Sequence, residues 1–194
     1  MLEASLSSQT RERDEQAGHP VSTSDDQRLF ATDVDDPVET EEASEVSRLV
    51  VFTDGACIGN PGPGGWGWAL GSERYASGAE PRTTNQRMEL FAVLDALRSN
   101  PGLVEIVSDS TYVVNCFKDR WWQGWRRRGW KNSKGEPVAN RDLWEPLIAE
   151  VVESRGQHGV VFRWVKGHAG DPMNEFVDLL ATTAARSQQG VRVP

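Results

Sequence analysis

Two aspartates stand where a buried strand would end, a position from which a carboxylate can reach a ligand. Asp54 follows an apolar run at residues 49–52, and Asp109 follows another at residues 103–107. Short apolar runs of this kind are typical of buried strands. The two acids are therefore expected on one rim of a sheet, although Asp109 taken alone is equally typical of a helix N-cap.

Three further side chains could act with these aspartates. Glu89 lies near the start of a predicted helix, where the helix dipole alone would favour an acid. Asp178 lies in the first turns of the last predicted helix. His168 stands in the loop before that helix, flanked by glycines, and a single loop histidine usually has no special role.

The elements that must position these residues follow from the hydrophobic pattern. Thr83 and Gln86 match a capping box at the start of the helix that carries Glu89. The glycine-rich segment 59–65 lacks the Gly-Lys-Ser/Thr ending of a P-loop, so we interpret it as a tight turn rather than a phosphate cradle. The predicted strands are 48–54, 65–70, 73–77, 103–107 and 160–165, and the later predicted helices are 111–117, 141–154 and 173–187.

The charge of the 194-residue chain is unevenly distributed. Residues 1–47 hold 13 acids and 3 bases, whereas residues 48–194 hold 16 acids and 18 bases. We predict a disordered acidic extension (1–47), a folded domain (48–187) and a C-terminal tail (188–194). A solvated extension without a specific partner is favoured over one that regulates or competes with a nucleic-acid ligand. The nearly neutral domain leaves a nucleic-acid partner open.

The cysteines and the lengths of the apolar runs bear on the compartment in which the protein is expected. Cys57 and Cys116 do not form a CxxC pair, which argues against a disulfide scaffold or a zinc site and is typical of a reducing cytosol. No signal peptide and no membrane-spanning run is recognisable. We therefore expect a cytoplasmic protein without a membrane partner.

Residues 120–134 have the most unusual composition in the chain. They hold no acids, four tryptophans and six bases, namely Trp121, Trp122, Trp125, Trp130, Arg120, Arg126, Arg127, Arg128, Lys131 and Lys134. Guanidinium groups contact phosphates, and aromatic faces pack on sugars or bases. The alternative is a helix with core tryptophans and solvated arginines, and both descriptions can hold. Nucleic-acid binding is favoured because the stretch concentrates positive charge.

Six motifs in order resemble those of bacterial type 1 ribonuclease H. They read FTDGACIGNPGPGGWGW, RTTNQRMEL, SDSTYVV, GWRRRGWK, VANRDLW and WVKGHAGDPMNEFVDLLA, and the resemblance covers roughly residues 49–185. The resemblance implies an α/β ribonuclease H-like fold, a five-stranded mixed sheet with helices on both faces. It also implies an endonuclease that hydrolyses the RNA strand of RNA–DNA hybrids with two metal ions, leaving 5′-phosphate and 3′-hydroxyl ends.

The resemblance further implies a role for individual residues. Metal ligands are expected at Asp54, Glu89, Asp109 and Asp178, with His168 assisting proton transfer or product departure. Contacts to the RNA strand are expected from Asn60, Asn85, Gln86 and the backbone near Cys57, with Asn174 as a further substrate contact. A DNA-phosphate pocket is expected from Arg82, Thr84 and Asn140. The handle, residues 121–131, is expected to grip the DNA strand through Trp121, Trp125, Arg126, Arg127, Arg128 and Lys131.

The chemistry expected of these acids is that of a metal-assisted hydrolase. Mg²⁺ prefers carboxylate and water oxygens, and two ions about 4 Å apart can serve the attacking and leaving oxygens, with Mn²⁺ a possible substitute. The expected partner is an RNA–DNA hybrid duplex, bound by a monomer. Two alternatives stay open: a hybrid-binding module that has lost catalysis, and another two-metal nuclease on this fold.

Overall fold

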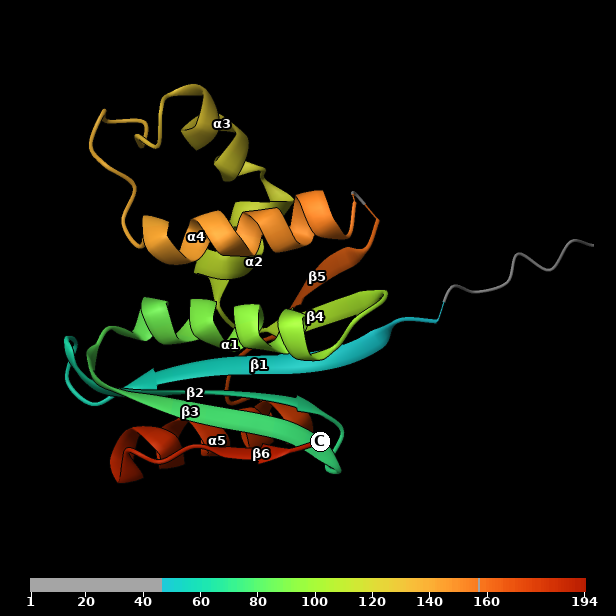
Figure 1. Ribbon diagram of the computed structural model, residues 1–194. Coiled ribbons are helices and arrows are strands. Elements are labelled where there is room, and N and C mark those ends of the chain that lie inside the picture. The colour runs from blue at the N-terminus through green and yellow to red at the C-terminus, as the bar shows by residue number, and fades with distance from the viewer. Residues whose placement is uncertain (1–46, 157) are drawn as a thin grey trace, which may run out of the picture. The chain divides into compact units, whose positions relative to one another are not determined.

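The computed structural model describes residues 47–156 and 158–194, so the predicted acidic extension lies outside the described residues except for Ser47. A six-stranded sheet with the order β5-β4-β1-β2-β3-β6 forms its centre (Figure 1). The strands are β1 (Leu49–Cys57), β2 (Gly62–Leu70), β3 (Arg74–Thr83), β4 (Val104–Ser108), β5 (Val160–Trp164) and β6 (Val191–Val193). The helices are α1 (Asn85–Ser99), α2 (Thr111–Lys118), α3 (Trp121–Arg127), α4 (Arg141–Ile148), the π-helical η1 (Ala149–Ser154) and α5 (Pro172–Ser187).

The sheet is mixed and covered on both faces. β1 runs parallel to β4, and β4 parallel to β5, whereas the β1–β2, β2–β3 and β3–β6 pairs are antiparallel. Helix α5 covers one face, and α1 lies on the other with α4 stacked above it (Figure 1). The predicted mixed sheet with helices on both faces is confirmed, with one strand more than predicted, because residues 191–193 of the predicted tail pair with β3.

Glycines allow the helices to approach the sheet closely enough to bring the acids together. A Cβ on Gly55 of β1 would lie closer than 3.0 Å to the backbone of Glu89 on α1. A Cβ on Gly65 or Gly67 of β2 would come equally close to atoms of α5. The glycine-rich segment 59–65 is a loop at residues 59–61 followed by the start of β2, and its Gly65 serves helix packing.

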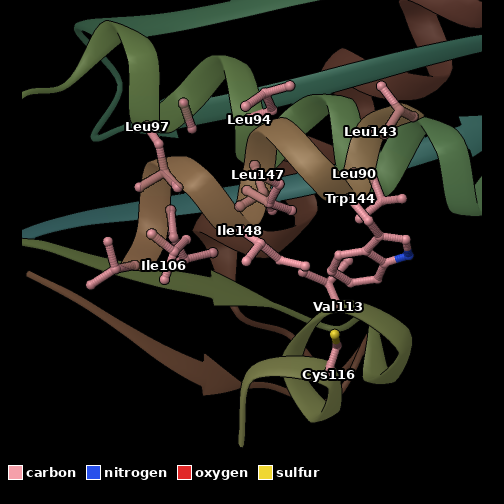
Figure 2. Close-up of a cluster of buried hydrophobic side chains, with 14 of the residues drawn as sticks. Leu90, Leu94, Leu97, Ile106, Val113, Cys116, Leu143, Trp144, Leu147 and Ile148 are labelled. Carbon is pink, nitrogen blue, oxygen red and sulfur yellow. The ribbon is translucent and has the colours of Figure 1, made fainter. Parts of the chain in front are cut away.

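A large apolar core lies between the sheet and helices α1, α2 and α4 (Figure 2). Trp144 of α4 is fully buried there, and its indole N–H donates to the Tyr112 hydroxyl at 2.7 Å. Phe117 of α2 stacks on Phe162 of β5 with ring centroids 4.4 Å apart. The core therefore joins helices α2 and α4 to strands β1 and β4.

Several predicted boundaries differ from the structure. Strands β1, β2 and β3 are longer than predicted because glycine interrupts their apolar pattern, whereas their pairing continues, with a register shift in the β2–β3 pair between Gly62 and Gly64. Helix α1 begins at Asn85 with Thr84 as N-cap and no side-chain cap bond, so the predicted Thr83–Gln86 capping box is absent. The predicted helix 141–154 is α4 followed by η1. No helix in the described residues is long and apolar enough to cross a membrane.

Candidate active site

Strand pairing places Asp54 and Asp109 next to each other. The parallel register matches Phe52 of β1 with Val107 of β4, and the two aspartates lie two residues further along their chains. Asp54 is inside β1 rather than at its end, because β1 continues to pair with β2 after β4 has stopped. Asp54 is only 9% exposed, and its carboxylate accepts a 2.7 Å hydrogen bond from the Gly55 amide.

Glu89 reaches the same rim from the second turn of α1. Helix α1 can pass close to β1 because position 55 carries no side chain. The Glu89 carboxylate accepts hydrogen bonds from the Ser110 hydroxyl at 2.6 Å and from the Asn85 amide at 2.9 Å. These two bonds turn the carboxylate toward the end of β4, beside Asp109.

Asp178 comes from α5, whose start is fixed by an N-cap. The Asp171 carboxylate accepts hydrogen bonds from the Met173 and Asn174 amides, and Pro172 occupies the first turn. Asn174 and Asp178 are four residues apart and therefore share one face of the helix. The Asn174 amide lies 3.5 Å from Asp109 Oδ2, so this face is turned toward the rim.

The other three carboxylates are close enough to Asp54 to raise its pKa. Burial, Asp109, Asp178 and Glu89 together raise the pKa of Asp54 to about 8, against a smaller opposing effect of the Gly55 amide. Burial also raises the pKa of Glu89, and the nearby Asp109 adds to the effect. Because burial and the neighbouring acids disfavour the charged forms of Asp54 and Glu89, these two carboxylates favour a bound cation that would neutralise them.

The donor set fits a hard divalent cation. Across residues 47–156 and 158–194, none of the ion pairs formed includes Asp54, Glu89, Asp109 or Asp178. Asn174 is 2% exposed, and its side-chain oxygen has no hydrogen-bond partner there. No three acid, histidine or cysteine side chains in the described ranges are already gathered around one point. The oxygens are therefore neighbours that a cation would draw together by side-chain rotation.

His168 is exposed in the loop between β5 and α5, with a left-handed backbone at φ +52°. The neighbouring Gly167 contacts Asp109: a Cβ there would lie closer than 3.0 Å to the carboxylate oxygen. The loop therefore passes directly over one of the candidate metal ligands. The predicted association of His168 with the acids is consistent with this path.

The residues predicted to contact RNA gather beside the acids. The Asn60 side-chain oxygen accepts from the Asn85 amide N–H at 3.3 Å, which joins the 58–61 loop to the start of α1. The Cys57 thiol lies 3.4 Å from the Thr83 carbonyl at the end of β3. Gln86 is exposed on the first turn of α1. Asn85 links this surface to the acids, because its side-chain amide donates to the Glu89 carboxylate.

The residues predicted to bind a DNA phosphate lie at two neighbouring helix starts. Arg87 of α1 makes a two-point ion pair with Asp142 of α4, at 2.7 and 2.9 Å. Thr84 precedes α1 and Asn140 precedes α4, so this ion pair joins the two helices in their first turns, close to both N-cap residues. Helices α1 and α4 start on the same side of the domain (Figure 1). Arg82 is exposed near the end of β3.

The handle is mixed in its exposure. Trp121 is 37% exposed, and Arg127, Arg128 and Lys131 are exposed. Trp125 is only 8% exposed and packs edge-on against Trp144, so it anchors the handle on the core, and its predicted contact with substrate stays a prediction. Arg126 is ion-paired with Glu153 at 2.6 Å. The alternative of core tryptophans and solvated arginines thus holds for part of this segment.

Ser110 is a functional candidate that sequence reasoning missed. It caps α2, is 5% exposed, and donates the shortest hydrogen bond received by Glu89. The available signal was its position directly after Asp109, which a cap prediction for Asp109 concealed. The structure gives the N-cap to Ser110 and frees Asp109 for the site.

Comparisons with known proteins agree with this architecture. Residues 46–186 match the RNase H family model. Ribonuclease H of Thermus thermophilus is 46% identical over 152 residues, covering 76% of this chain and 89% of the relative. Ribonuclease H of Nitratidesulfovibrio vulgaris strain DSM 19637 / Miyazaki F is 51% identical, covering 74% and 92%. Ribonuclease HI of Caulobacter vibrioides is 47% identical, covering 72% and 93%.

Solved structures show the same fold. LC9-RNase H1, described as a type 1 RNase H with the type 2 active-site motif, superposes with a TM-score of 0.60 at 34% identity, covering 77% of this chain and 80% of that one. A foamy viral protease-reverse transcriptase in complex with RNA/DNA hybrid superposes with a TM-score of 0.59 at 22% identity, covering 71% and 20%. The fold and the acidic rim define a nuclease-type α/β domain. The chain belongs to the ribonuclease H family, as its motifs predicted.

Proposed function

We propose that this protein is an endonuclease that hydrolyses the RNA strand of RNA–DNA hybrids, leaving 5′-phosphate and 3′-hydroxyl ends. The single observation that carries the proposal is the convergence of four acids on one rim, with the Asp54 pKa raised to about 8 by burial and its acidic neighbours. A structural role would not require uncompensated carboxylates in a partly buried place. The sequence similarity to ribonucleases H over three quarters of the chain supports the same activity.

Asp54, Glu89, Asp109 and Asp178 would hold two Mg²⁺ ions, for which Mn²⁺ can substitute. Bound there, the ions would supply an activated water and a counter-charge for the leaving oxygen. The protein's own contribution is positioning: Ser110 and Asn85 orient Glu89, and Gly55 keeps α1 close to β1. His168, exposed in the loop above Asp109, would move a proton at the leaving oxygen or assist product departure.

Substrate choice follows from the surfaces around the acids. Asn60, Asn85 and Gln86 carry amides that both donate and accept, which suits 2′-hydroxyls and minor-groove edges without base specificity. Thr84, Asn140 and Arg82 would take a phosphate of the DNA strand. Asn174, buried beside Asp109, is proposed as a contact near the scissile phosphate.

The exposed part of the handle would grip the DNA strand. Trp121, Arg127, Arg128 and Lys131 offer an aromatic face and cations outside the core. Phosphate contacts of this kind carry little sequence information and are strongly screened by salt. We therefore expect weak sequence preference and a steep decrease in hybrid affinity with salt.

The proposal includes a monomeric, cytoplasmic enzyme whose catalytic domain is residues 48–187, preceded by an acidic extension (1–47). The test is a cleavage assay with labelled hybrid, duplex RNA and duplex DNA in Mg²⁺, for the wild type and for Asp54→Asn. We expect cleavage of the hybrid alone, by the wild type alone. Binding of hybrid without cleavage would favour a catalytically silent module, and cleavage of duplex DNA would favour another two-metal nuclease.

A further inference from the structure

Trp164, the last residue of β5, makes a contact with the active site that no sequence motif predicted. Its indole N–H donates a 3.1 Å hydrogen bond to the main-chain carbonyl of Asp109. The indole is 50% exposed, so Trp164 is not held there by burial in the core. The hydrogen bond to a proposed metal ligand, rather than the exposure of the ring, is what makes Trp164 a candidate for a role at the site.

The Asp109 carbonyl occupies a gap between two regular elements. The β4–β5 ladder ends where the Val165 amide donates to the Ser108 carbonyl at 3.1 Å. The main-chain hydrogen bonds of helix α2 begin at Ser110, the residue after Asp109, where the Val114 amide donates to the Ser110 carbonyl. Asp109 therefore lies between the end of the sheet ladder and the start of the helix, and the Trp164 indole fixes its main chain there.

The side chain of Asp109 is bounded by the same segment of chain. Gly167 leaves no space for a Cβ beside the carboxylate, and the Asn174 amide lies 3.5 Å from it. Residues 164–174 thus contact Asp109 at its main chain and at its carboxylate. The same segment leads into α5, which carries Asp178.

We propose that Trp164 is a positioning residue for the metal site: its indole N–H holds the Asp109 main chain so that the Asp109 carboxylate faces Asp54 and Asp178. The inference rests on the proposed function. Because the contact is at the surface, water replaces the lost donor when the N–H is removed, so the fold is little affected. The orientation of Asp109, however, becomes less restricted, which weakens cation binding.

The test compares Trp164→Phe with the wild-type full chain. Phenylalanine keeps an aromatic ring but cannot donate the hydrogen bond. We expect the Mg²⁺ concentration for half-maximal binding, measured calorimetrically without substrate, to rise roughly three- to tenfold, the equivalent of one neutral hydrogen bond. The melting temperature without metal and the KM for hybrid should stay unchanged. Val161→Ala, on the same strand, is the matched control and should change none of these values.

Two further measurements separate positioning from general loosening. In the Asp109→Asn background, Trp164→Phe should have no added effect on Mg²⁺ affinity, because the group it positions is gone. In the wild type, the Trp164 indole N–H resonance, assigned by its loss in Trp164→Phe, should shift during a Mg²⁺ titration. If the wild type cleaves hybrid, two results would overturn the Trp164 inference and leave the proposed function intact. These are an indole N–H resonance that does not shift with Mg²⁺, and equal Mg²⁺ affinities of Trp164→Phe and the wild type. A wild type that neither binds Mg²⁺ nor cleaves hybrid would overturn the proposed function as well.

Discussion

The Ser110 hydroxyl donates a 2.6 Å hydrogen bond to the Glu89 carboxylate and so ties the start of α2 to α1. The same oxygen accepts from the Val113 amide as the N-cap of α2. One side chain therefore sets a helix start and the direction of a proposed metal ligand. The position of Glu89 therefore depends on the start of α2 as well as on its own helix.

Ser110→Ala should affect both stability and metal binding. Loss of the cap and of the buried hydrogen bond should lower the free energy of unfolding by about 1–2 kcal/mol. The released Glu89 carboxylate should also need more Mg²⁺ for half-maximal binding. Chemical denaturation and calorimetric titration measure the two effects. Ser110→Thr, which keeps the hydroxyl, is the control, and an alanine variant equal to the wild type in both would contradict this role.

The metal-free protein should lose stability as pH rises because of Asp54. Its pKa is raised to about 8 in the folded protein, so folding favours the protonated acid. The associated stability is complete below the ordinary pKa of 3.8 and is lost as pH rises through that of the folded state. Between about pH 5 and pH 8, the free energy of unfolding in EDTA should therefore decrease for the wild type relative to Asp54→Asn.

The control for this pH effect is the same comparison with saturating Mg²⁺. Metal binding requires the ionised carboxylate, so Mg²⁺ affinity should increase as pH rises toward 8. With Mg²⁺, the free energy of unfolding of the wild type should therefore increase relative to that of Asp54→Asn as pH rises, the opposite of the trend in EDTA. Parallel pH profiles of the two proteins in EDTA would show that Asp54 does not carry the raised pKa.

Gly55→Ala should destabilise the fold strongly. Its Cβ would overlap the backbone of α1 at Glu89, which cannot move without repacking the helix on β1. A loss of about 3 kcal/mol or more is expected, at the upper end for overpacked positions. Gly124→Ala is the matched control, because its Cβ meets only the flexible Arg128 guanidinium and alanine favours the helix. Equal thermal stability of the two variants would contradict the close-approach argument.

Asp95 should contribute more to stability than its partner Arg192. The Asp95 carboxylate accepts a 2.6 Å hydrogen bond from the buried Trp68 indole and pairs with Arg192 of β6 at 2.8 Å. Asp95→Ala leaves the indole N–H without its partner, at a cost of about 1–3 kcal/mol. Arg192→Ala removes a half-exposed ion pair, worth about 1 kcal/mol or less. Denaturation curves giving the opposite order would contradict this account.

The sequence predicted what depends on local pattern. Asp54 and Asp109 follow apolar strands, and two parallel neighbours bring strand ends to one rim, so their meeting could be foreseen. The direction in which Asp178 points depends on where α5 begins. Asp171 and Pro172 set that start, and both are local signals in the sequence. The family motifs then assigned all four acids before any geometry was available.

The contacts that orient these acids could not be predicted, because they depend on register between distant elements. The Ser110–Glu89 and Trp164–Asp109 hydrogen bonds join residues 21 and 55 positions apart. For Trp125, the surrounding charge indicated binding but gave no sign of its packing against Trp144, and its contact with substrate stays a prediction. Strand β6 escaped prediction because three largely exposed residues carry no burial pattern.

The most direct test of the four-acid site is the single-turnover rate of hybrid cleavage in saturating Mg²⁺ for Asp54→Asn, Glu89→Gln, Asp109→Asn and Asp178→Asn. Each amide keeps the shape of the acid but removes its charge, so each rate should decrease by about 100-fold or more while hybrid binding persists. Asp95→Asn, whose carboxylate binds Trp68 instead, should cleave at the wild-type rate. A wild-type rate for any one of the four variants would contradict the shared metal site.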